Sequence, residues 1–140
     1  MQLAATESNV GRLTRAGVLT AISTIGANGA PGEHVIKQYV GNLVAIARLP
    51  GAAGLDWGQA FAAITSRPAE ALGMGGEIGS LRAGRRADVV VWSGDPLELS
   101  SAPQAIWIDG RPQPTQSRQT RLRDRYLTPT ETTLPKAYSY

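Results

Sequence analysis

The sequence predicts an α/β fold, in which helices and short strands alternate along the chain. Three observations support this class. Residues 6–16 have a helical pattern that stops at Gly17 and leads into the apolar run Val18–Thr24. The stretch Glu33–Arg48 has the apolar spacing of an amphipathic helix. The run Val89–Trp92 is β-branched and aromatic throughout, which is typical of a strand.

The first helix and the run after it are predicted to form an αβ unit. Apolar residues fall on one side of the helix, and Gly17 is well suited to end it, because glycine readily adopts a positive φ. The run Val18–Thr24 carries no charge, so we predict a buried strand of the kind found in parallel sheets. Residues 25–32 follow as a connection rich in Gly and Pro. They lack the Gly-Lys-Ser/Thr ending of a phosphate-binding loop.

Three more helices are predicted before the next strand. Glu33–Arg48 presents one apolar stripe, because its apolar residues recur at intervals of three and four. Asp56 and Gln59 have the spacing of a capping box at the start of a second helix. Pro68 suits the first position of a third, short helix, and Gly73 suits its end.

The second half of the chain is predicted to begin with a small set of strands. Val89–Trp92 is apolar enough to be covered on both faces, and Gly94-Asp95-Pro96 ends it. Asp109-Gly110, after the apolar run Ile106–Ile108, is a strong hairpin signal. One strand and one hairpin are marginal in water, so another segment is expected to cover them.

The last part of the chain is polar and basic. Ser117 is placed to cap a helix that runs to Tyr126, and Thr128–Tyr140 is rich in Thr and Pro without periodicity. We expect this tail to be frayed or disordered. The helix carries four arginines: Arg118, Arg121, Arg123 and Arg125.

Two motifs in the middle of the chain carry a family resemblance. Thr65–Gly73 follows the pattern T-x-N-P-A-x-x-L-G with Arg67 in place of the usual Asn, and Gly79–Val91 follows G-S-L-x-x-G-x-x-A-D-L-V-V. Together with the Asp-Gly hairpin, they resemble the C-terminal end of the amidohydrolase superfamily. The likeness is greatest to imidazolonepropionase-like members, which are metal-dependent hydrolases of C–N bonds. It covers roughly residues 1–113.

The resemblance implies a particular arrangement of the predicted elements. We expect a partial TIM-like barrel end, the last αβα elements, followed by the C-terminal strands of a small composite β-sandwich. The expected divisions are residues 1–76 for the barrel elements, 77–115 for the sandwich strands and 116–140 for the basic helix and tail. A whole barrel takes about 250 residues, so 140 residues can hold only part of one.

The family's active site, as the resemblance implies it, holds zinc or another divalent metal. Its ligands are a His-x-His pair, a Lys or Glu, two further His and an Asp after the last barrel strand. Here that Asp is expected near position 25, where Ile25 stands, and no Asp precedes Asp56. A catalytic zinc needs three protein ligands, and one His with no Cys cannot supply them. We therefore expect no metal to be held by this chain alone.

Three residues are candidate site residues: His34 as a substrate contact or an auxiliary metal ligand, and Ser23 and Thr24 as contacts of a substrate or a metal-bound water. His34 lies at the start of a helix near the expected barrel mouth, but a partly exposed helix-start residue is the simpler interpretation. Ser23 and Thr24 end the predicted strand and could offer hydroxyls. Such hydroxyls more commonly serve packing or backbone hydrogen bonds.

The sequence leaves three candidate functions for the chain. The favoured one is the C-terminal fragment of an amidohydrolase-like hydrolase of non-peptide C–N bonds, inactive alone, whose partners are the missing N-terminal barrel segment and a small-molecule substrate. The second is a non-catalytic, scaffold-like relative, which Ile25 favours. The third is a basic nucleic-acid-binding module, which we disfavour because no set of aromatic residues is interleaved with the arginines.

Composition narrows these functions only slightly. The net charge is +3, a mild basic bias, and the apolar fraction of 42% allows a core. No apolar run approaches the ~20 residues of a membrane span, so we expect no membrane partner. The chain has no Cys, which leaves the compartment undetermined.

Overall fold

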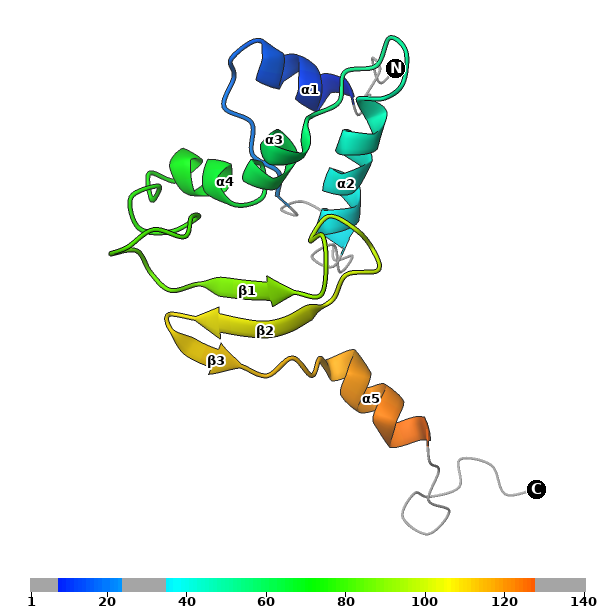
Figure 1. The fold of residues 1–140 in the computed structure, drawn as a ribbon, viewed down its shortest axis with the longest axis vertical. Helices are drawn as coiled ribbons and strands as arrows, with labels where there is room; N and C mark the ends of the chain where they lie inside the picture. The colour runs from blue at the N-terminus through cyan, green and yellow to red at the C-terminus, as the bar shows by residue number, and fades with distance from the viewer. Residues whose placement is uncertain (1–7, 24–34, 128–140) are drawn as a thin grey trace, which may run out of the picture.

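The computed structural model describes residues 8–23 and 35–127, and the α/β class is confirmed over them. Figure 1 shows a group of helices with a small sheet beside it and a last helix that extends away. The helices of the group are α1 (Ser8–Arg15), α2 (Ile36–Ile46), α3 (Trp57–Ala62) and α4 (Ser66–Ala71). They are followed by β1 (Val89–Trp92), β2 (Pro103–Ile108), β3 (Arg111–Gln113) and α5 (Arg118–Leu127).

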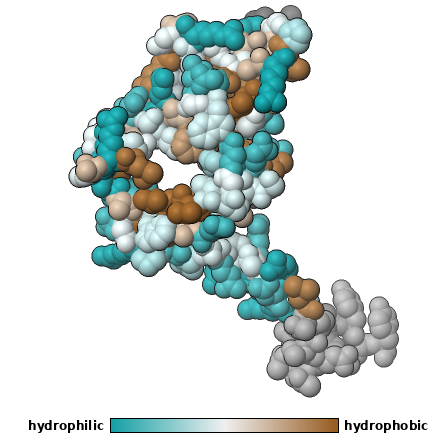
Figure 2. Space-filling model, in the orientation of Figure 1, coloured by the Kyte–Doolittle hydropathy of each residue, from teal (hydrophilic) through white to brown (hydrophobic). Residues whose placement is uncertain are grey.

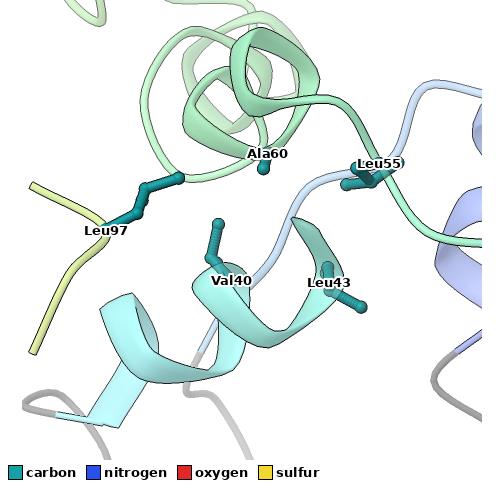
Figure 3. Packing of buried hydrophobic residues seen from close by; sticks show 5 residues of the cluster. All are labelled: Val40, Leu43, Leu55, Ala60 and Leu97. Carbon is teal, nitrogen blue, oxygen red and sulfur yellow. The ribbon is translucent and has the colours of Figure 1, made fainter. Parts of the chain in front are cut away.

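The core lies between α2 and α3. Val40 and Leu43, from the predicted apolar stripe of α2, are fully buried, and they pack with Leu55, Ala60 and Leu97 (Figure 3). Leu97 comes from the loop between β1 and β2, so this loop reaches back to the helices. Burying an aliphatic side chain stabilises a fold by about 1.5–3 kcal/mol. Because few side chains are buried in this cluster, its total contribution to stability is modest.

The predicted start of α3 is confirmed in detail. Asp56 Oδ1 accepts a hydrogen bond from the backbone N–H of Gln59 at 2.7 Å, and Gln59 Oε1 accepts one from the backbone N–H of Asp56 at 3.2 Å. The reciprocal pair satisfies donors that a helix start leaves unpaired.

The short helix α4 begins earlier than predicted. It starts at Ser66, so Pro68 is the third helical residue and not the first. Proline is tolerated there because the first N–H groups of a helix have no intrahelical acceptor in any case. Gly73 ends the helix with a φ of 73°, as predicted.

The sheet is antiparallel, in the order β1-β2-β3. The predicted hairpin is confirmed: Asp109 and Gly110 both have positive φ, 53° and 71°, which matches the twist of the strands they join. The predicted covering of β1 on both faces is wrong for the described residues. Val90 and Val91 are each 43% exposed, because no helix of this part of the chain packs broadly on the sheet.

The predicted strand Val18–Thr24 is not formed over its described part. Residues 18–23 run without regular structure, and the backbone N–H of Ile22 donates to the carbonyl of Ala63 at 2.9 Å. A parallel strand is held by neighbouring strands, and within the described ranges none lies beside this segment. Thr24 lies outside the described residues.

Other predicted boundaries differ by small amounts. The helix predicted over Glu33–Arg48 is described from Ile36 and ends at Ile46, and its first predicted residues lie outside the described ranges. The basic helix α5 is confirmed, with Ser117 Oγ accepting from the N–H of Thr120 at 3.1 Å. The tail Thr128–Tyr140, expected to be disordered, also lies outside the described residues.

Candidate functional site

The segment 18–23 leads toward the place where the sequence predicts a site. Its start is fixed to α1, because the N–H of Val18 donates to the carbonyl of Leu13 at 3.0 Å and the hydroxyls of Thr14 and Thr20 are 2.8 Å apart. Ser23, one of the predicted site residues, is exposed at the end of the segment. Thr24, Ile25 and His34 lie outside the described residues, so the grouping of the predicted site residues stays a prediction.

Residues 8–23 and 35–127 contain no group of three His, Cys, Asp or Glu side chains that could hold a metal ion. Two of their carboxylates, those of Asp56 and Asp95, stabilise the fold. Asp56 caps α3, and Asp95 accepts from the indole N–H of Trp57 at 2.9 and 3.0 Å and from the N–H of Leu97 at 2.9 Å. The residues described here therefore do not fit a catalytic metal.

A third carboxylate, that of Asp88, joins the basic turn to the hairpin. The side chain of Arg86 donates to Asp88 Oδ2, from Nε at 2.7 Å, and the backbone N–H of Asp109 donates to Asp88 Oδ1 at 2.9 Å. These two donors stabilise the ionised carboxylate and so hold the pKa of Asp88 below its ordinary value, and Arg86 has the larger effect. In turn, the hydrogen bond with Asp88 raises the pKa of Arg86, because it stabilises the charged guanidinium. Asp88 thus ties the start of β1 to the hairpin turn.

The helices and the sheet are joined by two contacts that the sequence analysis missed. Lys37 Nζ lies 4.9 Å from the centre of the Trp92 ring and donates to the carbonyl of Ser101. Trp57 and Asp95 form the second contact. Both link residues that are far apart in the chain, and no local spacing pattern predicts such pairs.

The two motifs that carry the family resemblance meet in space. A Cβ on Gly79 would lie 2.7 Å from the Cβ of Ala69 and 2.9 Å from the carbonyl oxygen of Thr65, so only glycine lets the second motif pack this closely on α4. Gly79 also has a φ of 83°. The next two residues are unusual: Ser80 Oγ is buried without a hydrogen-bond partner within the described ranges, and Leu81 is 79% exposed.

The model of the amidohydrolase family matches residues 8–113, and the chain belongs to this family. Within it, the chain is imidazolonepropionase-like. Proteins of this family generally use divalent metals.

Similar proteins agree with this assignment. An amidohydrolase, tasK, of Hapsidospora irregularis is 48% identical over 60 residues, which are 43% of this chain and 6% of that protein. An imidazolonepropionase of Acidiphilium cryptum is 41% identical over 59 residues, 42% of this chain and 14% of that protein. The crystal structure of an amidohydrolase from Thermotoga maritima is 28% identical, with a TM-score of 0.66, and the match covers 76% of this chain and 26% of that one.

The matches cover only part of each similar protein. This chain spans a small part of the curated relatives that it matches and about a quarter of the solved structure. Over the described residues, no helix is both long and apolar enough to cross a membrane.

Proposed function

We propose that this chain is the C-terminal portion of an amidohydrolase-like hydrolase that acts on C–N bonds other than peptide bonds. In this proposal it supplies the last elements of the barrel and the C-terminal strands of a composite β-sandwich. The upstream segment of the same protein supplies the ligands for zinc or another divalent metal, and the substrate is a small molecule. The isolated chain is then inactive.

The observation that carries the proposal is the unfinished packing of the described residues. Val90 and Val91 on the sheet are partly exposed, and so are Val18 and Leu19 on the segment that was predicted to be a strand. Figure 2 shows an opening between the helices and the sheet, with hydrophobic side chains along its border. Apolar surface of this kind is usually covered in a complete domain.

Ser80 adds a polar counterpart to this apolar surface. A buried hydroxyl without a hydrogen-bond partner lowers the stability of a fold by about 1–3 kcal/mol. Ser80 Oγ is such a hydroxyl, and the exposed Leu81 is the next residue. An upstream segment that packs on this motif would pair the hydroxyl and cover the leucine in one step. The coverage of 26% of the Thermotoga structure supports the existence of such a segment.

One observation favours a second function. The acid expected after the last barrel strand is replaced by Ile25. A parent that lacks this carboxylate lacks a metal ligand and the general base that would activate the water. The second candidate is therefore a non-catalytic, scaffold-like relative with the same fold.

Sequencing the DNA upstream of the Met1 codon tests the proposal. An in-frame segment that encodes a His-x-His strand supports the hydrolase, and an in-frame barrel segment without it supports the scaffold-like relative. A stop codon directly upstream, with a stable folded product, contradicts both.

The variant Ser80→Ala tests the same proposal on the protein itself. In the isolated chain we expect it to be as stable as the natural sequence or more stable, because an unpaired buried hydroxyl is removed. Ser93→Ala is the matched control: Ser93 Oγ accepts from the N–H of Ala102 at 3.0 Å, so its loss is expected to destabilise the chain. Destabilisation by Ser80→Ala equal to that of the control would mean that the hydroxyl is already paired.

A further inference from the structure

The positive charge of the chain is concentrated on α5. Four arginines and Asp124 give this helix a charge of +3, which equals the net charge of all 140 residues, so the rest of the chain is neutral as a whole. The helix also lies beyond residues 8–113, the part that matches the amidohydrolase family. The basic element therefore lies outside the part of the chain that matches the family.

Three of the four arginines of α5 lie along one side of the helix. Arg118, Arg121 and Arg125 line one groove together with Leu122. They are separated by three and four residues, which corresponds to about 4.5 and 6 Å along a helix axis. The fourth arginine, Arg123, is paired with Asp124 at 2.8 Å. Within the described residues, no carboxylate pairs with the three that line the groove.

The surroundings leave this side open to a partner. Figure 1 shows α5 extending away from the other helices, and Figure 2 shows a mostly hydrophilic surface over it. Tyr126 follows Leu122 by one turn and is 64% exposed, so its ring is open to solvent on the side of the helix next to Leu122. An isolated helix of ten residues is marginal in water, and a bound partner would stabilise it.

We propose that α5 binds single-stranded nucleic acid, with the three arginines on consecutive phosphates and Tyr126 stacked on a base. A strand of nucleic acid carries a regular row of negative charges, and arginine suits phosphate because of its planar, forked donors. Exposed aromatic rings beside a basic groove stack with bases in proteins that bind single strands without sequence preference. The binding therefore depends on charge and stacking, and not on base sequence.

A membrane surface fits this helix less well. A helix that lies on a bilayer needs a continuous apolar face. In α5, Leu122 and Tyr126 lie beside the arginines, whereas Leu127 lies on a different side, so the apolar residues do not form one face. An acidic protein would match the charges but would leave the ring of Tyr126 without its stacking partner.

The test is the binding of a fluorescent 20-nucleotide oligothymidine to the full chain, measured by anisotropy from 50 to 200 mM NaCl. Three phosphate contacts on a single strand predict a slope of log affinity against log salt of about −2. Over this range the affinity then falls by roughly 20-fold. The double variant Arg121→Ala, Arg125→Ala keeps one of the three phosphate contacts. We expect its affinity to fall only about threefold between 50 and 200 mM NaCl, and to be much lower than that of the natural chain at every salt concentration.

Two controls separate this surface from general basicity. The double variant Arg12→Ala, Arg15→Ala removes two exposed arginines with similar spacing on α1, and it should leave binding unchanged. Tyr126→Ala should weaken binding with the salt slope unchanged, and Tyr126→Phe should restore it. The proposal is overturned if the α1 variant weakens binding as much as the α5 variant. It is also overturned if the oligonucleotide does not bind, or if vesicles containing phosphatidylserine or polyglutamate bind more tightly than the oligonucleotide.

Discussion

Replacing Gly11 with alanine tests how closely α1 packs on the loop before α3. On an open helix surface this change stabilises a protein by roughly 0.5–1 kcal/mol, because glycine is a poor helix former. In this structure the added Cβ would lie 2.1 Å from the carbonyl oxygen of Ala53 and 2.7 Å from that of Gly54. Both obstacles are backbone atoms, so they cannot rotate away as a side chain would.

The size of the effect follows from these distances. A carbon–oxygen contact needs about 3.3 Å, so α1 must retreat from the loop by about 1 Å. Overpacking of this kind costs about 1–3 kcal/mol. The retreat also strains the hydrogen bond from the N–H of Ala53 to Ser8 Oγ, 3.1 Å long, which contributes about 1 kcal/mol. After the gain in helix propensity, we expect a net loss of about 1–3 kcal/mol for Gly11→Ala.

Urea denaturation followed by tryptophan fluorescence measures the free energy of unfolding, and amide hydrogen exchange shows where the change occurs. Protection should fall most at Ala53, whose N–H donates to α1, and less at Leu55, whose N–H donates to Leu43 at 3.0 Å. The matched control is Gly58→Ala in α3, where the added Cβ meets only Asp56 Oδ1 at 3.4 Å. A Gly11→Ala chain as stable as the control would refute the packing described for α1.

Three further predictions concern the core, the hairpin and the joint between helices and sheet. Leu43→Ala should cost about 2–5 kcal/mol because the side chain is fully buried, whereas Leu72→Ala, at a side chain 73% exposed, should stay within ~0.5 kcal/mol in the same denaturation assay. Because the pKa of Asp88 is lowered in the folded chain, its ionised carboxylate stabilises the fold above the ordinary carboxyl pKa of 3.8. This stabilisation is lost as the pH falls through the pKa that Asp88 has in the folded state. Hairpin amide protection should therefore decline below about pH 4, and Asp88→Asn should remove that dependence; a decline of equal size in the variant would exclude Asp88 as its source. Asp95→Ala should cost about 1 kcal/mol and change the fluorescence of Trp57, whose indole N–H it accepts; an unchanged spectrum would contradict that contact.

The features that the sequence predicted correctly are set by neighbouring residues. The capping box of Asp56 and Gln59 depends on a three-residue spacing, and the hairpin depends on two adjacent residues that tolerate positive φ. The apolar stripe of α2 follows from helical periodicity alone. In each case the physical cause lies within one turn of the chain, so local pattern is sufficient.

The features that it did not predict depend on distant parts of the chain. Val18–Thr24 has the composition of a buried strand, but a strand also needs neighbouring strands. Its described part instead donates backbone hydrogen bonds from Val18 to Leu13 and from Ile22 to Ala63. The contacts of Lys37 with Trp92 and of Trp57 with Asp95 join elements that no spacing rule relates. Of the predicted site residues, only Ser23 is described, and its side chain is exposed.

Metal analysis of the purified chain, combined with an assay for hydrolysis of a cyclic amide, is the most direct test of the account. The account predicts no stoichiometric zinc or other divalent metal, no hydrolysis and a broad thermal transition, since the described packing is unfinished. A monomer that binds one metal ion per chain, unfolds sharply and cleaves the amide unaided would contradict it.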